Sequence, residues 1–207
     1  MTKPLLAFLL LLPLYPQAQI QAPDELNNKA TPATEPDGQG TTASNGGRRV
    51  PAEWEPQEAI WLQWPGAWEK TYEEAFAAFS CIIINYEKLH VLYESSEVLR
   101  DAKASLLKAG CDPEHEFITW HDIPYDSAWM RDNGPVFVTE AGNVRVQNWQ
   151  FDAWGGRFGD DVPYEQDDLV PLRVAEYLDL PLDKIGIVHE RGNLEFNGDD
   201  AVILNWS

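Results

Sequence analysis

Short apolar runs alternate with amphipathic stretches along the chain from Val50 onward. Runs rich in β-branched and aromatic residues, bounded by Gly, Pro, Asn or Asp, predict β-strands. Such runs occupy residues 59–64, 89–93, 117–120, 136–138, 144–149, 185–188, 194–196 and 201–204. Asn197-Gly198 lies between the last two runs and predicts a two-residue hairpin turn.

Other stretches have the apolar spacing of helices. The first follows Thr71 and Glu74, which have the spacing of a capping box, and carries the apolar residues Phe76, Phe79, Ile82, Ile83 and Tyr86. The second opens at Ser96, should place Val98, Leu106 and Leu107 on one side, and stops at Gly110. The third covers residues 168–180, with Pro171 near its start, where a helix tolerates proline.

The order of these elements predicts a mixed α/β fold rather than an all-β fold or a helix bundle. A unit of strand, strand, helix and strand recurs along the chain, which suggests a repeat architecture.

The first 49 residues differ in character from the rest. Residues 1–22 hold Lys3, an apolar run at 5–12 and a small-residue ending, which is typical of a secretory signal peptide with cleavage after Ala18 or Ala22. The apolar run is shorter than the roughly twenty residues of a membrane span, so we expect export to the periplasm or beyond rather than a membrane span. An uncleaved anchor is the alternative. Residues 23–49 are rich in Pro, Gly, Thr and Asn, and predict a disordered linker before a domain at 50–207.

Charge narrows the class of partner. The chain has 15 Lys and Arg against 34 Asp and Glu, a formal net charge of -19. Nucleic-acid binding needs a basic face, so this balance argues against it. It is compatible with a small cationic substrate, and the alternative explanation is that the acidic residues only keep the protein soluble.

Cysteine and histidine give no evident catalytic or metal centre. Cys81 and Cys111 could pair in an oxidising compartment, and neither has the surroundings of an activated thiolate. The four His residues show no metal-ligand spacing.

The densest chemistry lies in residues 125–135, between two predicted strands. Trp129, Arg131, Asp132 and the Gly134-Pro135 turn follow Asp126 within a few residues. Taken singly, each has an ordinary structural interpretation, such as a turn cap, a surface ion pair or a core aromatic. Together, carboxylates beside an indole make a seat for a flat cation, because a guanidinium can form paired hydrogen bonds with a carboxylate and stack on an aromatic face.

Four blocks resemble the agmatine deiminase and bacterial (Porphyromonas-type) peptidylarginine deiminase family. They are residues 51–59 with Trp61, Trp64 and Pro65, then 129–135, 151–156 and 190–198. The resemblance implies a pentein fold, an α/β propeller of strand-strand-helix-strand units. It implies hydrolysis of a guanidinium through a Cys thiouronium intermediate, with no cofactor and no metal. The first expected reaction is conversion of agmatine to N-carbamoylputrescine and ammonia, as in putrescine biosynthesis.

The resemblance assigns roles residue by residue. Asp132 matches the acid that binds the guanidinium, Trp129 the aromatic beside it, and Glu190 the acid of a Glu-Gly-Gly block. Arg191 stands where that block has Gly, and could either fit in a loop or obstruct the site. We expect structural roles for Asp126, which would cap the turn, and for Arg131, which would orient Asp132. Arg157 is expected to be a solvated loop charge.

The family's His-x-Asp and nucleophilic Cys have no match in this sequence. The resemblance therefore predicts a fragment, about the first half of the domain, with little or no turnover. Alternatives are a protein-arginine deiminase that forms citrulline, a guanidinium-binding remnant without catalysis, and a misfolded fragment without function. The sequence does not predict the oligomeric state.

Overall fold

The computed structural model describes residues 47–159 and 161–205. The predicted signal peptide and nearly all of the predicted linker lie outside these residues. No helix in the described ranges is long and apolar enough to cross a membrane. At the start of the described chain, Arg49 pairs with Thr139 through two backbone hydrogen bonds of 3.0 and 2.9 Å, so the folded part includes the residue just before Val50.

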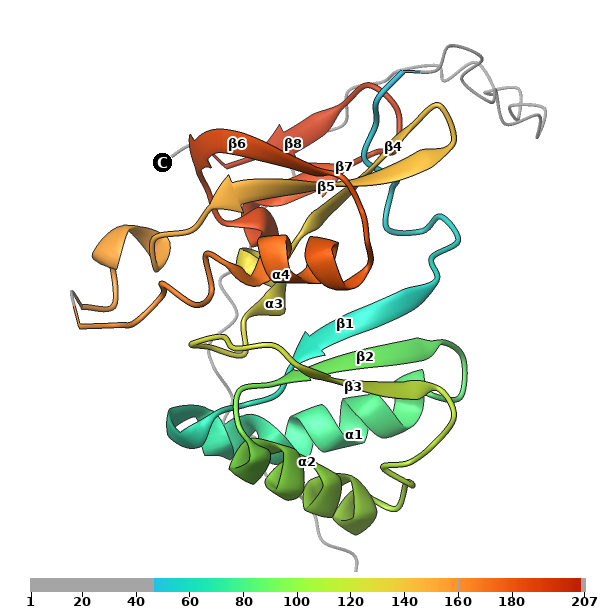
Figure 1. Ribbon diagram of the computed structural model, residues 1–207, viewed down its shortest axis with the longest axis vertical. Helices are drawn as coiled ribbons and strands as arrows, with labels where there is room; N and C mark the ends of the chain where they lie inside the picture. Colours follow the sequence, from blue (N-terminus) through green and yellow to red (C-terminus); the bar gives the residue numbers. More distant parts are fainter. Residues whose placement is uncertain (1–46, 160, 206–207) are drawn as a thin grey trace, which may run out of the picture. The chain divides into compact units, whose positions relative to one another are not determined.

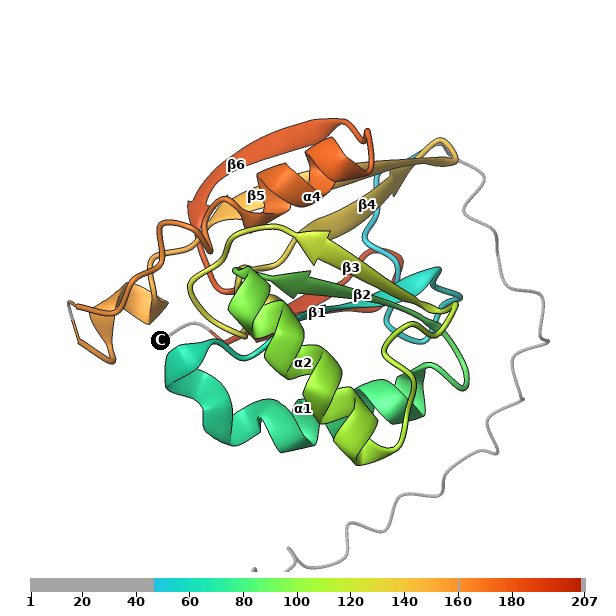
Figure 2. The same cartoon turned by 60° about the horizontal axis from the view of Figure 1, so that its bottom comes forward.

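Three parallel strands form the first sheet, in the order β1-β2-β3 (Figure 1). They are β1 (Ala59–Gln63), β2 (Lys88–Tyr93) and β3 (Ile118–Asp122). A short 3-10 helix, η1 (Ala67–Tyr72), leads into α1 (Glu73–Ile83), and α2 (Ser96–Ala109) follows β2. Figure 2 shows α1 and α2 side by side on one face of this sheet.

The strand β2 is buried on both faces, as alternation along a strand permits. Leu89 and Val91 pack with Trp64, Val98 and Leu106 under the two helices. Leu92 belongs to a second cluster with residues from the loop after β3 and from α4 (Val170–Tyr177), namely Ile123, Tyr125, Val170 and Val174. The two clusters together form the core around β2.

A second sheet has the order β4-β5-β6. The hairpin of β4 (Val136–Glu140) and β5 (Asn143–Gln150) is antiparallel, and β6 (Leu182–Val188) returns through α4 to lie parallel to β5. This is the predicted strand-strand-helix-strand unit. The first sheet departs from that unit, because a helix separates β1 from β2. A final hairpin consists of β7 (Leu194–Phe196) and β8 (Val202–Leu204).

Three local predictions were wrong. Thr71 does not cap α1, because it lies inside η1, which runs directly into α1 through Tyr72 without a side-chain cap. Leu107 is 64% exposed, since it is one residue, and therefore about 100°, around the helix from buried Leu106. The hairpin loop spans residues 197–201 rather than two residues, because the Asn197 side-chain oxygen accepts hydrogen bonds from the backbone of Asp199 and Ala201.

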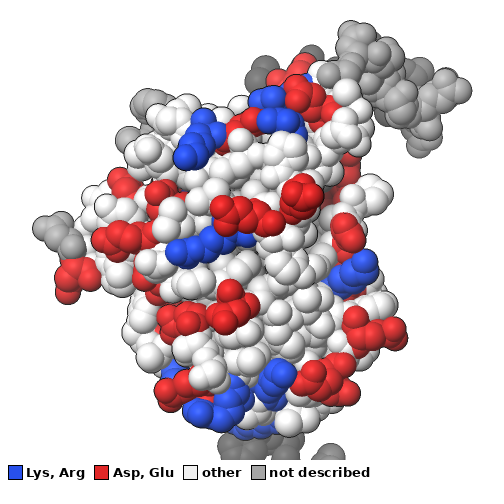
Figure 3. Space-filling view, viewed as in Figure 1, with Lys and Arg blue, Asp and Glu red and all other residues white. Residues whose placement is uncertain are grey.

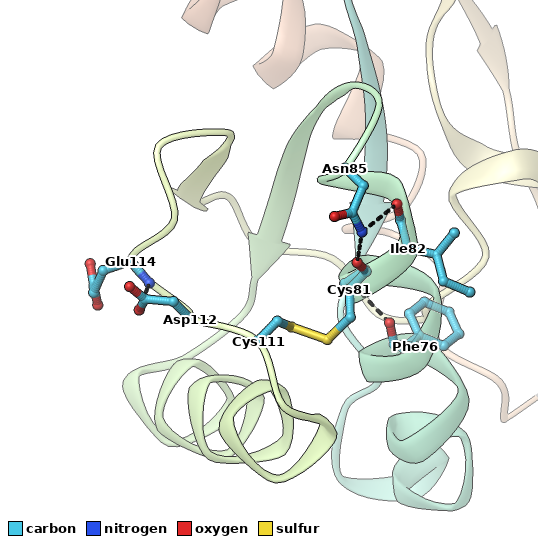
Figure 4. The surroundings of a disulfide bond; sticks show 8 residues. Phe76, Cys81, Ile82, Asn85, Cys111, Asp112 and Glu114 are labelled. Atoms are coloured by element: carbon cyan, nitrogen blue, oxygen red, sulfur yellow. Dashed lines mark hydrogen bonds between the residues drawn. A yellow bond between two sulfur atoms is a disulfide. The ribbon is translucent and has the colours of Figure 1, made fainter.

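The helix α2 follows its sequence signals closely. Ser95 Oγ accepts a hydrogen bond from Val98 N at 3.2 Å, and Gly110 ends the helix in the left-handed region at a φ of 95°. A disulfide joins Cys111, just after this helix, to Cys81 in α1, with their Cα atoms 5.7 Å apart (Figure 4). The pairing that the sequence left open is therefore present in the structure, and neither cysteine is a free thiol.

Candidate functional site

The loop between β3 and β4 is anchored by a buried carboxylate from a distant segment. Asp167 is 1% exposed. Its carboxylate accepts hydrogen bonds from Asp126 N, Ser127 N, Ser127 Oγ and Gln63 Nε2 at 2.6–3.2 Å. Burial raises the pKa of Asp167 to about 6, and the donors from Ser127 and Asp126 oppose that rise. The first half of the loop is thus tied to an acid that lies 40 residues further on.

A second buried carboxylate supports the next residues of the loop. Glu69, also 1% exposed, accepts a hydrogen bond from Ala128 N at 2.8 Å through Oε2. Its Oε1 has no partner within the described chain. Burial raises the pKa of Glu69, whereas the hydrogen bond from Ala128 N lowers it. Glu69 therefore holds the main chain at Ala128, directly before Trp129, which carries the candidate indole.

A one-turn helix, α3 (Met130–Asn133), presents Asp132. The turn closes through hydrogen bonds from Asp132 N and Asn133 N to Trp129 O at 2.8 and 3.0 Å. Gly134 ends it, and a Cβ at this position would lie 2.3 Å from Met130 O, so only glycine fits. The predicted Gly-Pro turn thus serves to end the helix immediately after the candidate acid.

Asp132 meets the segment 190–193 across the site. A Cβ built on Gly192 would lie 2.0 Å from Asp132 Oδ1, so the carboxylate lies against the backbone there. Burial raises the pKa of Asp132; hydrogen bonding by Trp154 lowers it, Glu190 raises it, and the charges of Arg131 and Arg191 lower it. The structure therefore brings Asp132 and Glu190 together in one electrostatic environment.

Aromatic rings line this acidic site. Trp129, 42% exposed, meets Trp154 and Tyr72 edge-to-face at centroid distances of 6.3 and 6.2 Å. Trp154 also meets the buried ring of Phe151 at 5.1 Å. The sequence identified the 151–156 block but not Trp154 itself. The adjacent Gly155-Gly156 pair was the available signal in the sequence, because glycine readily adopts positive φ. The backbone indeed has positive φ at both glycines and also at Ala153 and Trp154.

The residues that were predicted to flank or support the site contact the following partners. Asp126 Oδ2 accepts a hydrogen bond from Gln166 N at 2.7 Å, which fastens the loop to a segment far along the chain. Arg131 forms ion pairs with Glu53 and Glu195, and contributes only its charge to the environment of Asp132. Arg191 is buried, and its guanidinium donates to main-chain carbonyl oxygens of Asp132 and Trp149.

A cavity of about 730 Å³ borders this site through Met130, Arg131 and Arg191. Its lining includes Trp61, His90, Phe137 and Phe196, and includes none of Trp129, Asp132 and Glu190. Within the described ranges, no group of three or more His, Cys, Asp or Glu residues is arranged to hold a metal ion. On the face in Figure 3, acidic and basic side chains are interspersed.

Comparisons with known proteins show which family and which solved structures this chain resembles. A family model described as Porphyromonas-type peptidyl-arginine deiminase matches residues 49–207. An agmatine deiminase of Pseudomonas aeruginosa is 36% identical over 138 residues, which cover 63% of this chain and 35% of that protein. The solved agmatine deiminase of Enterococcus faecalis is 30% identical, with a TM-score of 0.65, over 75% of this chain and 43% of that one. The chain spans less than half the length of the curated relatives it matches.

Proposed function

Because the chain belongs to the Porphyromonas-type peptidyl-arginine deiminase family, we propose that its site binds a guanidinium group for hydrolytic deimination. The proposed substrate is agmatine, and the products are N-carbamoylputrescine and ammonia. Asp132 and Glu190 would bind the guanidinium, and Trp129 would lie against its face. The sequence identity to agmatine deiminases supports agmatine.

The observation that carries the proposal is the contact between α3 and the segment 190–193. It sets the Asp132 carboxylate against Gly192 and into the electrostatic field of Glu190, beside the indoles of Trp129 and Trp154. A guanidinium is a planar cation with several donors, so two carboxylates and an aromatic wall match both its charge and its shape. Holding it in one orientation is the contribution that these residues would make to the reaction.

We expect binding rather than turnover from the 207-residue chain itself. The family reaction needs a Cys thiolate, and both cysteines of this sequence are joined in the disulfide. The disulfide also supports our proposal that the protein is exported, because disulfides persist in oxidising compartments. We further propose a pentein propeller, supported by the strand-strand-helix-strand unit of residues 136–188.

A second candidate function is deimination of arginine in peptides. The observation that favours it is the exposure of two aromatic side chains, Trp129 at 42% and Phe158 at 66%. An exposed edge of this kind would leave room for a peptide backbone. Titration with agmatine and with a capped arginine dipeptide distinguishes the two candidates.

The test is isothermal titration calorimetry of the full chain with agmatine. Asp132→Asn should abolish binding, because it removes the charge that meets the cation, whereas Asp122→Asn, at an exposed position, should leave it unchanged. Cooperative thermal unfolding by circular dichroism must accompany each sample, since a misfolded chain would also fail to bind. Binding that survives Asp132→Asn in a folded variant would show that Asp132 is not the guanidinium acid.

A further inference from the structure

Arg191 is a buried cation beside the candidate site, and the proposed reaction assigns it no role. It is 6% exposed and opens η3 (Arg191–Asn193). Its Nη1 donates a hydrogen bond to the carbonyl oxygen of Asp132 at 3.2 Å, and its Nη2 donates to the carbonyl oxygen of Trp149. Burying a charged group is unfavourable unless hydrogen bonds and opposite charge compensate, so the placement of this side chain requires an explanation.

The two carbonyl groups lie on different elements. Asp132 lies in α3 and Trp149 in β5, while Arg191 itself belongs to η3. One guanidinium therefore connects three separate elements at the candidate acid. Its Nε has no partner among the described residues, so the two Nη contacts determine where the group lies.

Bonding to the main chain, rather than to the carboxylate, has a specific consequence. A side-chain ion pair between Arg191 and Asp132 would occupy the oxygens that a substrate guanidinium needs. The structure instead directs Arg191 to the Asp132 carbonyl and leaves the carboxylate free of that contact. The charge of Arg191 still acts on Asp132 through space.

We infer that Arg191 is a positioning residue for Asp132, a buried guanidinium that holds the main chain of α3 against β5 and supplies positive charge near the carboxylate without occupying it. Its consequence for substrate binding rests on the proposed function. The positional role itself does not, and can be tested without any substrate.

The charged groups around both side chains determine the direction of the effect. Burial lowers the pKa of Arg191 to about 10, with Asp168 and Asp132 opposing, so the guanidinium is charged at neutral pH. For Asp132, burial and Glu190 raise the pKa, and Arg131 and Arg191 lower it. Removing the charge of Arg191 must therefore raise the pKa of Asp132 further and shift its ionisation to higher pH.

The experiment measures the pKa of Asp132 by carboxyl carbon NMR in the full chain, with Asp132→Asn to assign the signal. Arg191→Gln should raise that pKa by about one pH unit or more, the typical effect of removing a nearby opposite charge. Arg191→Lys keeps the charge but loses the planar fork, and should give a smaller rise. Arg157→Gln, at an exposed position, is the matched control and should change nothing.

An unchanged Asp132 pKa in folded Arg191→Gln would overturn the inference. If Arg191→Gln fails to fold, the exchange of guanidinium protons with solvent is measured in the unmodified chain instead. Slower exchange at Arg191 than at Arg157 would support the inference, and equal exchange would overturn it. If agmatine binds, its affinity should fall on acidification as Asp132 becomes protonated. In Arg191→Gln this fall should occur at a higher pH, because the pKa of Asp132 is raised. If agmatine does not bind the unmodified chain, the proposed function fails, while the NMR titration still decides the role of Arg191.

Discussion

Gly192 contacts Asp132 so closely that no side chain fits between them. The distance of 2.0 Å from a Cβ at position 192 to Asp132 Oδ1 is far below van der Waals contact. The carboxylate and the backbone of η3 therefore determine each other's position, although 59 residues separate neighbouring Arg191 from Asp132.

Gly192→Ala should displace Asp132 and abolish the proposed binding of agmatine. Overpacking of this kind costs about 1–3 kcal/mol of stability, so the variant should remain folded with a lower melting temperature. Gly186→Ala is the matched control, because a Cβ there meets no atom within 4 Å. Calorimetric titration and thermal unfolding of both variants test this. Normal agmatine affinity in Gly192→Ala would contradict the contact.

Asp167 should make the protein less stable as the pH rises. Its carboxyl has a pKa of about 6 when folded and 3.8 as a free side chain, so between these values the folded state holds more protons than the unfolded state. Its contribution therefore declines as the pH increases from 4 to 6 and is constant above that range. The total decline is about 3 kcal/mol, from 1.36 kcal/mol per unit of pKa difference.

Urea unfolding of the unmodified chain and of Asp167→Asn, at intervals from pH 4 to pH 7, measures this contribution. The difference between the two free energies of unfolding should change by about 3 kcal/mol in favour of the variant over that range. Asp122→Asn, which is exposed, should give a constant difference. Parallel curves for Asp167→Asn would refute the assignment.

Glu69 should tolerate glutamine but not alanine. Glu69→Gln keeps an oxygen for Ala128 N and removes a buried charge, so its stability at neutral pH should be equal or higher. Glu69→Ala leaves Ala128 N without an acceptor, which costs about 1–3 kcal/mol. Chemical denaturation compares the two, with exposed Glu116→Ala as the control. Equal losses for the Gln and Ala variants would show that the hydrogen bond is unimportant.

Removing the disulfide should destabilise the first sheet and its helices. The bond closes a loop between positions 30 residues apart, for which chain entropy predicts about 3–4 kcal/mol of stabilisation. The double variant Cys81→Ala, Cys111→Ala should lose this amount in chemical denaturation. Reductant should destabilise the unmodified chain to the same extent and leave the double variant unchanged. Insensitivity of the unmodified chain to reductant would argue against the bond.

The sequence predicted much of this architecture because its signals are local. Apolar runs located the strands, and Gly110 ends α2 as expected. The Thr71 prediction failed because a preceding 3-10 helix occupied the position at which a cap acts. A short sequence window contains no information about such a neighbouring element.

The anchors of the site were missed for a different reason. Asp167 lies 40 residues from Ser127 and Glu69 lies 59 residues from Ala128, and nothing near these acids in the sequence marks them as buried. Trp154 was missed because it is one of many aromatic residues in the chain. The local cluster that contains Trp129 and Asp132 suggested a cation site by its composition, whereas Glu190 was singled out only because its block resembles a family.

The burial of β2 on both faces has a mechanical consequence for the site. Tyr125, at the start of the loop, donates its hydroxyl proton toward the carbonyl oxygens of Trp64 and Leu92, so the loop is fastened to the centre of the core. Amides in such a strand exchange with solvent only when the whole domain unfolds. The loop before Asp132 therefore takes its rigidity from the global stability of the domain, and core substitutions remote from Asp132 should weaken the proposed guanidinium binding.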